Sequence, residues 1–278
     1  MTTNSFPELD AGDIRATRDA LHAYARVLGD WLKASRAKRK HWWHASLRPS
    51  LRGLTTGVVH AGGDFELELD FVASRLHVRS PENDFAEDLA GQSAASIATW
   101  LDEKLVAIGV DPSLAPGDKV RGDYTFADYS AAKATILQAA LASVSAALAN
   151  FRAGIREETS PIQVWPHHFD LSMVWLPGQK IPGQDPADEE YSDKQMNFGF
   201  VFGDESFAAP YFYVTAYPLP AALPKIELPA GTTWMSEGFS GAVLLYKDLV
   251  AVNDPAAYLQ ELWAKLLAAG QTHLANND

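Results

Sequence analysis

Two pairs of histidines and a neighbouring carboxylate are the side chains whose types and spacing could do chemistry. His41 and His44 stand three positions apart, and His167 and His168 are adjacent, with Asp170 two positions beyond them. Imidazole and carboxylate groups act as general acids and bases and bind metal ions. In an extended chain His168 and Asp170 share one face, and His44 from an equivalent strand could approach them. One hypothesis is therefore a metal- or acid/base-dependent hydrolase with His44, His168 and Asp170 as candidate catalytic residues.

The spacing of the first histidine pair argues against a metal site. Apolar Trp43, Ala45 and Leu47 alternate with polar residues, which predicts an extended segment. Residues three positions apart in a strand point to opposite faces, so His41 and His44 would not share a metal ion. We therefore expect these histidines to be structural or surface residues, and we expect no metal site.

Several other chemistries lack their sequence signals. The chain has no Cys, which excludes disulfides, thiolate zinc sites, iron–sulfur clusters and a cysteine nucleophile. It contains no G-x-S-x-G, no G-x-x-x-x-G-K-[ST] and no G-x-G-x-x-G motif, which are the signals of serine hydrolases and of phosphate-binding loops. The sequence therefore predicts no cofactor.

A second hypothesis, ligand binding, comes from the aromatic residues. Many of them lie on or beside predicted strands, and buried Tyr and Trp tips need hydrogen-bond partners. An aromatic-lined cavity between sheet and helices would suit a small anionic or planar ligand. The residues we expect to bind this ligand are Trp43, Arg52, Thr55, Thr56 and Tyr217. The alternative is an ordinary aromatic core with Arg52 in a salt bridge.

Charge is spread unevenly along the chain. The formal net charge is -12, yet the stretch from Arg26 to Arg52 contains eight basic residues and one acid, Asp30. The acidic remainder repels nucleic acid, so we expect no nucleic-acid partner. The basic stretch either solvates the end of a helix or holds a small anion. A third hypothesis is a protein-interaction module that uses this stretch or the acidic loop from Asp185 to Asp193.

Hydrophobic periodicity predicts the elements that position these residues. Apolar residues at helical spacing predict four long helices; they cover about 11–35, 97–108, 128–153 and 255–270. Asp254 and Pro255 indicate the start of the last helix, and Gly270 its end. Alternation of apolar and polar residues predicts strands; they lie near 53–59, 65–71, 76–78, 162–164, 169–175, 196–202, 211–217 and 242–246.

The clearest alternation predicts a hairpin between residues 65 and 79. A two-residue turn at Ala73-Ser74 would place Asp70 opposite His77 and Glu68 opposite Arg79. Acids would then face bases across the pair of strands. This pairing gives the charges a structural role.

Together these signals predict an α+β fold, with mainly antiparallel sheet covered by about four long helices. We expect a single compact domain over residues 1–278, with two similar halves, about 11–110 and 128–270, that suggest duplication of a helix-strands-helix unit. No run approaches 18 apolar residues and the N-terminus lacks the pattern of a signal peptide. The sequence therefore predicts a cytoplasmic protein without a membrane partner, and leaves its oligomeric state open.

Several short motifs follow one another along the chain in the order found in a known family. They are His41-Trp42-Trp43-His44, Arg52-Gly53-Leu54-Thr55-Thr56, Phe65 to Phe71, Phe151-Arg152-Ala153-Gly154, Ser160-Pro161, Phe169-Asp170-Leu171 and Ala216-Tyr217-Pro218. Over nearly its whole length the sequence resembles the bacterial domain-of-unknown-function family 5996. The resemblance implies no established activity. It implies histidines where this chain has Gln163 and Asp193, so a site that needed those histidines would be incomplete here.

Overall fold

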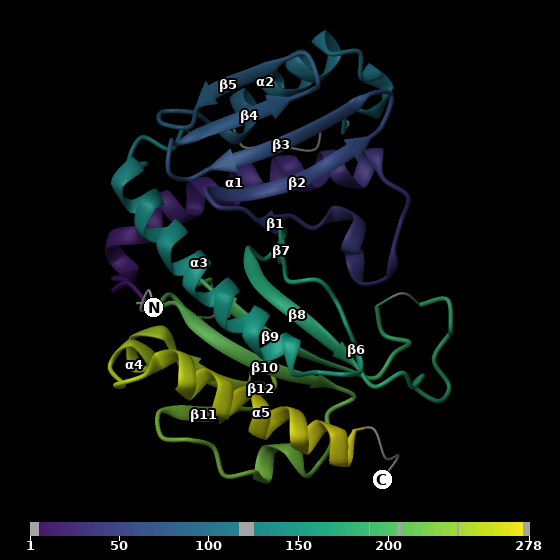
Figure 1. The fold of residues 1–278 in the computed structure, drawn as a ribbon, viewed down its shortest axis with the longest axis vertical. Helices are drawn as coiled ribbons and strands as arrows, with labels where there is room; N and C mark the ends of the chain where they lie inside the picture. Colours follow the sequence, from purple (N-terminus) through teal and green to yellow (C-terminus); the bar gives the residue numbers. More distant parts are fainter. Residues whose placement is uncertain (1–5, 117–124, 189, 205–206, 238, 275–278) are drawn as a thin grey trace. The chain divides into compact units, whose positions relative to one another are not determined.

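The computed structural model describes residues 6–116, 125–188, 190–204, 207–237 and 239–274, and the fold is α+β. The chain divides into two compact units (Figure 1). We call Gly12–Ala142 with Gln163–Phe169 the N-terminal unit, and Met1–Ala11 with Ser143–Ile162 and Asp170–Asp278 the C-terminal unit. The boundary falls inside helix α3 (Ala131–Ala153). The expectation of one domain over 1–278 stays a prediction.

The N-terminal unit is built on a five-stranded antiparallel sheet whose strands follow one another in chain order. The strands are β1 (Arg48–Pro49), β2 (Gly53–His60), β3 (Asp64–Asp70), β4 (Arg75–Arg79) and β5 (Asp84–Asp88). The remaining elements of this unit are α1 (Ala11–Ser35), η1 (Lys40–Ala45), α2 (Ala94–Ala107), η2 (Pro112–Leu114) and β7 (Gln163–Trp165). Figure 1 shows α1 and α2 covering one face of the sheet. Phe65, Leu67 and Leu69 are buried on β3, so the predicted apolar face of this strand belongs to the core.

The C-terminal unit has an antiparallel sheet with the order β11-β12-β10-β9-β8-β6. The strands are β6 (Glu158–Thr159), β8 (Asp170–Leu176), β9 (Gln195–Val201), β10 (Tyr211–Tyr217), β11 (Thr232–Met235) and β12 (Gly241–Leu245). The helical elements are η3 (Leu223–Lys225), α4 (Tyr246–Val250) and α5 (Pro255–His273). The ring of Trp263 on α5 lies 5.4 Å from Phe151 and 6.3 Å from Phe212. Aromatic side chains therefore fill the space between helix and sheet in this unit.

The four predicted long helices are confirmed as α1, α2, α3 and α5. Asp254 caps α5 by accepting a hydrogen bond from the backbone of Ala257, with Pro255 in the first turn. The predicted end of α5 at Gly270 is wrong, since the helix continues to His273. A Cβ on Gly270 would lie 2.1 Å from the sulfur of Met196, so this glycine permits close packing on β9 and does not terminate the helix.

The predicted strand around residues 43–47 is wrong, because Lys40–Ala45 form the 3-10 segment η1. Its buried residues are His41, His44 and Ala45, while Trp42 is exposed. These buried positions follow the spacing of a helical turn. His44 is therefore not on a strand, and the alternation of apolar and polar residues was too short to distinguish the two conformations.

The predicted hairpin of β3 and β4 is confirmed, but its predicted register is wrong by two residues. Asp70 pairs with Arg75 and Glu68 pairs with His77, since the strands are joined by four residues, 71–74, and not by two. A shift of two keeps every side chain on the same face. Acids therefore still meet bases, and Arg79 Nη1 lies 2.6 Å from Glu68 Oε2.

Helix α3 is long and apolar enough to cross a membrane by length and composition, and it is the one such helix among the described residues. About half of its apolar window, 56%, is buried inside the protein. Leu137, Leu141 and Leu148 are nearly inaccessible to solvent. The core helix of a globular protein has the same properties, so the helix gives weak evidence for a membrane.

Gly29 provides a test of how α1 is held in the N-terminal unit. A Cβ at this position would lie 2.7 Å from Cβ of Pro166, whose ring cannot swing away. We expect Gly29→Ala to lower the free energy of unfolding by about 1–3 kcal/mol, because overpacking outweighs the better helix propensity of Ala. Chemical denaturation measures the change. Gly63→Ala is the control, since its Cβ would meet only Ile108 O at 3.8 Å; equal stability of both variants and wild type would contradict this packing.

Candidate functional site

The end of α1 leads into a stretch of chain that carries positive charge alone. Residues 31–63 contain seven Lys and Arg residues and no Asp or Glu. We call the part of this stretch around η1 the cationic tryptophan cluster; it consists of Lys33, Arg36, Lys38, Arg39, Lys40, Trp42, Trp43 and Arg48. All its members belong to the N-terminal unit.

Two neighbouring residues of η1 have left-handed backbone conformations. His41 has φ 51 and Trp42 has φ 56. For a residue with a Cβ this region costs roughly 1–2 kcal/mol. Such strain persists only where the surrounding structure enforces it, and it is concentrated at binding and active sites. Here it places the large side chain of Trp42 at the surface, with 37% of the residue exposed.

The ring of Trp42 is surrounded by cationic and aromatic groups. The ammonium groups of Lys33 and Lys38 lie 5.1 Å and 5.8 Å from its centroid. The imidazole of His44 stacks on it at 5.7 Å, with 27° between the planes. A cation over the face of an indole is attracted by the ring quadrupole. The lysine ammonium groups are thereby held next to a flat aromatic surface.

His44, a candidate catalytic residue, is buried and has a structural contact. Its Nδ1 accepts a hydrogen bond from the backbone N–H of Arg39 at 3.1 Å. The acceptor role of Nδ1 places the proton of the neutral ring on Nε2. This bond ties the segment after α1 to η1, and so His44 helps to position the cations of the cluster.

The side chains of Trp43 and Gln163 each carry a buried N–H group close to η1. Ser46 Oγ lies 2.9 Å from Trp43 O and 2.6 Å from Gln163 Oε1, so the three residues are close together. Gln163 is 1% exposed. Within the described part of the chain, neither Gln163 Nε2 nor Trp43 Nε1 has a hydrogen-bond acceptor. Buried donors are normally satisfied, so both are available to an anion or to another acceptor.

Arg36 and Arg48 are two basic members of the cluster that have no acid partner among the described residues. Arg36 donates from Nη2 to the backbone oxygen of Thr56 at 2.9 Å. Burial lowers the pKa of Arg36, and the positive charge of Arg48 lowers it further. No ion pair joins either arginine to an acid among the described residues. Two arginines that repel one another without a counter-charge favour the binding of an anion.

The other expected ligand-binding residues of this unit are engaged within the sheet. Arg52 forms an ion pair with the buried carboxylate of Asp70. Thr55 Oγ1 donates to Glu66 Oε1 at 2.5 Å. Thr56 Oγ1 donates to the backbone oxygen of Gly57 at 2.7 Å. A ligand would have to displace these contacts, and the salt bridge of Arg52 fits the structural alternative for that residue.

His168, the second candidate catalytic residue, lies in the exposed turn before β8. Its ring centroid is 4.4 Å from that of His167. His168 belongs to the N-terminal unit, and Asp170 to the C-terminal unit. In the described ranges no group of three or more His, Asp or Glu side chains is arranged to hold a metal ion.

Asp170 and Tyr217 lie on one face of the sheet in the C-terminal unit. Asp170 is buried and accepts a hydrogen bond from the Tyr213 hydroxyl. Burial and the negative charge of Asp170 raise the pKa of Tyr213 well above its usual value. Tyr217 meets the ring of Tyr191 edge-on at 5.2 Å. Both candidate residues therefore have partners from their own unit.

The two positions that depart from the family pattern also have structural partners. Gln163 lies beside Ser46, as described above. Asp193 forms an ion pair with Lys180 at 2.9 Å, and their backbones pair as an isolated antiparallel bridge. Gln163 thus brings a polar group into contact with the cationic tryptophan cluster, while Asp193 closes a loop of the C-terminal unit.

Sequence reasoning selected Trp43 from the His-Trp-Trp-His motif but did not select Trp42, Lys33 or Lys38 as individual ligand residues. The signal was present in the run of basic residues around two tryptophans. Once η1 is treated as a turn, the exposed position of Trp42 follows from its place beside the buried His41 and His44.

A matched pair of substitutions at Trp42 measures the backbone strain. Trp42→Gly and Trp42→Ala remove the same ring, and they differ only in the Cβ. We expect the Gly variant to be more stable than the Ala variant by about 1–2 kcal/mol, because Ala is strained at positive φ. At the helical, exposed position Ala34, replacement by Gly lowers stability by about 1 kcal/mol. Denaturant unfolding measures both effects, and a less stable Gly variant at position 42 would rule out the left-handed backbone.

Comparison with known proteins gives one match. The family model described as "Family of unknown function (DUF5996)" matches residues 6–277. No curated protein and no solved structure matches the chain.

Proposed function

The chain belongs to the DUF5996 family, and we propose that it binds a small planar anion at the cationic tryptophan cluster. The observation that carries the proposal is the exposed ring of Trp42, with the ammonium groups of Lys33 and Lys38 at 5.1 Å and 5.8 Å from its centroid. A protein keeps cations together at a cost in stability unless an anion completes the arrangement. Arg36 and Arg48 add two further positive charges that have no acid partner among the described residues.

The exposed indole of Trp42 supports the planar part of the proposal. A flat ring offers stacking to a planar ligand, and an aromatic ring stacked on a base contributes about 1–3 kcal/mol. The unsatisfied N–H groups of Trp43 and Gln163 supply directional hydrogen bonds for an acceptor. Positive charge, a stacking surface and hydrogen-bond donors therefore come together around η1.

The charge of the rest of the chain supports a small ligand. The formal net charge of -12 repels an extended polyanion, so nucleic acid is disfavoured. We also propose a cytoplasmic protein without a membrane partner, because the sequence has no signal-peptide pattern and no run of 18 apolar residues. The absence of Cys fits a reducing compartment.

Two other functions remain as alternatives. An acid/base or metal-dependent hydrolase would use His44, His168 and Asp170, although His44 and Asp170 each have a hydrogen-bonded role in the fold. A protein-interaction module would use the basic stretch or the acidic loop of residues 185–193, of which residue 189 lies outside the described ranges. The uncompensated cations favour the binding of an anion over the hydrolase.

Internal duplication also remains a proposal. The two units share a plan in which a set of antiparallel strands is followed by a helix. In the N-terminal unit β2 to β5 precede α2, and in the C-terminal unit β8 to β12 precede α5. The strand orders differ, because β12 lies between β10 and β11, and no repeated residues accompany the shared plan.

Flavin mononucleotide and riboflavin are matched probes for this site, because they share one planar ring and differ by a phosphate. We expect flavin mononucleotide to bind the full chain at least about ten-fold more tightly than riboflavin, since a charge-assisted contact contributes about 1.5–3 kcal/mol. Isothermal titration calorimetry measures both affinities, and it can be used unchanged for variants that lack a tryptophan. Inorganic phosphate at equal ionic strength should compete with the nucleotide.

Two variants separate the ring from the charge. Trp42→Ala should weaken binding of flavin mononucleotide by about ten-fold through lost stacking. Arg48→Gln should weaken the binding of flavin mononucleotide and leave the affinity for riboflavin unchanged. It should not lower the melting temperature, because it removes the charge that repels Arg36. Lys265→Gln, on the exposed face of α5, changes net charge equally and should have no effect.

Three results would count against the proposal. Equal affinity for the two flavins would show that the charge of the ligand does not contribute to binding. An unchanged affinity for flavin mononucleotide in both Trp42→Ala and Arg48→Gln would show that the ligand does not bind at the cluster. Tighter binding of a single-stranded oligonucleotide than of flavin mononucleotide would make nucleic acid the ligand.

A further inference from the structure

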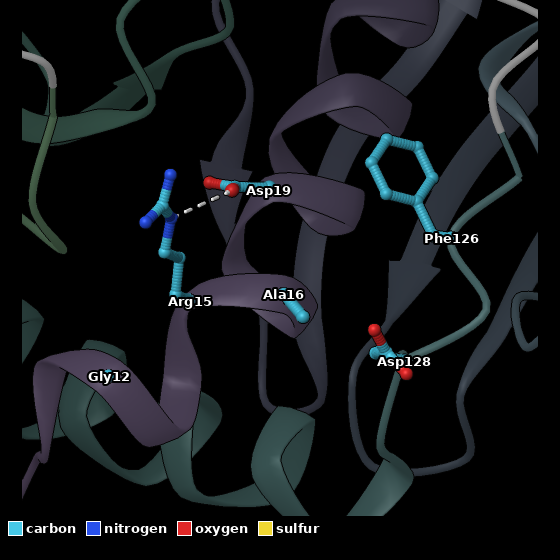
Figure 2. Close-up of a pocket in the computed structure, with 6 residues that line it drawn as sticks. All are labelled: Gly12, Arg15, Ala16, Asp19, Phe126 and Asp128. Atoms are coloured by element: carbon cyan, nitrogen blue, oxygen red, sulfur yellow. Dashed lines mark ion pairs between the residues drawn. The ribbon is translucent and has the colours of Figure 1, made fainter.

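Two further features of the N-terminal unit lie outside the cationic tryptophan cluster. The first is a hollow of about 320 Å³ beside the first turns of α1 (Figure 2). Its Arg15 pairs with Asp19 and points away from Phe126 and Asp128, so the charged side chains do not converge on one ligand. The second feature is the outer edge of the five-stranded sheet, which β5 forms.

β5 is an edge strand, because β4 is its one neighbour in the described sheet (Figure 1). Asn83 and Ser80 exchange backbone hydrogen bonds of 3.4 Å and 2.8 Å, and Leu89 donates to Ser74 O at 2.9 Å. Bonded pairs alternate along an antiparallel ladder, so the odd-numbered residues from 83 to 89 bond to β4. The residues between them direct their backbone groups away from β4; they are Asp84, Ala86 and Asp88.

These outward backbone groups have no partner in the described part of the chain. No hydrogen bond from outside β4 reaches the N–H or C=O groups of Asp84, Ala86 or Asp88 there. All three residues are exposed, and they alternate with half-buried residues along β5. The edge therefore presents free donors and acceptors to water, which is the arrangement that accepts an added strand.

The charges on the polar face of the sheet indicate which kind of strand would fit. Two rows of residues in register run across β3, β4 and β5, and each row reads acid, base, acid. The rows are Asp70–Arg75–Asp88 and Glu66–Arg79–Asp84. Arg75 Nε lies 2.8 Å from Asp88, and Arg79 Nε lies 3.5 Å from Asp84. Because the side chains of Asp88 and Asp84 are 70% and 60% exposed, each can also pair with a base on the next strand.

The same acids disfavour a second copy of β5 as the added strand. Antiparallel pairing of two copies around Ala86 would place Asp84 opposite Asp88 twice. Like charges directly opposite one another destabilise a pair of strands, and charged edges prevent self-association. The occupant that fits this edge therefore carries positive charge.

We propose that β5 accepts an extended segment of a partner protein as a sixth strand. The backbone of this segment bonds to Asp84, Ala86 and Asp88, and two basic side chains four positions apart lie opposite the two acids. Each row then reads acid, base, acid, base. The backbone bonds supply affinity and the two bases supply specificity. This interaction does not depend on the cationic tryptophan cluster.

A palindromic peptide, acetyl-Thr-Lys-Val-Thr-Val-Lys-Thr-amide, has the lysine spacing and the alternation that the edge requires. Fluorescence anisotropy of the labelled peptide measures its affinity for the full chain. We expect replacement of both lysines by glutamate to weaken binding at least about ten-fold, because two favourable cross-strand pairs become repulsive. N-methylation of the central threonine should weaken binding about ten-fold, whereas N-methylation of one valine, whose N–H points to solvent, should not.

Two variants at one exposed position test the backbone of β5. Ala86→Pro removes the outward N–H and should abolish binding, while Ala86→Thr keeps this group and should bind as the wild type does. Proline is tolerated on an edge strand where the lost N–H faces solvent, and melting curves confirm that both variants fold. Combined Asp84→Asn and Asp88→Asn substitutions should remove most of the preference for the lysine peptide over the glutamate peptide.

Three results would overturn the proposal. The first is no detectable binding of the lysine peptide at about 1 mM. The second is equal binding of this peptide and of the peptide methylated at the central threonine, because charge alone would then hold the peptide. The third is binding that persists in Ala86→Pro.

Discussion

A run of basic residues with no acid among them distinguishes the segment after α1 from the remainder of the N-terminal unit. On the sheet, bases meet acids: Arg52 pairs with Asp70, and Arg75 with Asp88 at 2.8 Å. In residues 31–63 no acid occurs at all. The imbalance is therefore local, and it lies where Arg36 crosses from the end of α1 to the backbone of β2. The account of ligand binding depends on this one electrostatic feature.

Packing supplies the rigidity that such an arrangement needs. Gly29 lets α1 approach Pro166 closely, and Leu47 exchanges two backbone hydrogen bonds with Val164. These contacts lie on either side of η1, in which His41 and Trp42 have positive φ. The strained turn and the uncompensated cations thus share one framework. Charge repulsion and backbone strain both lower stability, and burial in the surrounding core offsets them.

The four long helices could be predicted from the sequence, although α5 ends later and α2 and α3 begin at other residues than expected, whereas short elements could not. The 25 residues of α1 contain several turns of apolar spacing, which no other structure satisfies. The six residues of η1 fit alternation as well as they fit a turn, so periodicity over so short a segment could not distinguish the two. The register of β3 and β4 depended on the length of the turn, and φ 55 at Ser74 is not visible in the sequence.

The candidate site could be predicted in part. The aromatic residues on predicted strands, together with Arg52, Thr55 and Thr56, suggested an anionic or planar ligand, and the basic stretch suggested a helix end or a small anion. Ligand binding remains a proposal. Individual residues were harder to select, because Arg52 and Thr55 carry suitable groups that the fold engages with Asp70 and Glu66. Pairing across a sheet depends on register, which composition does not contain.

Nuclear magnetic resonance of the side-chain N–H groups tests the central claim most directly. Inorganic phosphate is titrated into the ¹⁵N-labelled full chain at constant ionic strength, and the indole resonance of Trp43 and the amide resonance of Gln163 are followed. The account predicts that these two signals shift together and saturate, since both groups lie at the cationic tryptophan cluster without an acceptor among the described residues. Unchanged signals for both groups, at phosphate concentrations that shift other residues, would contradict it.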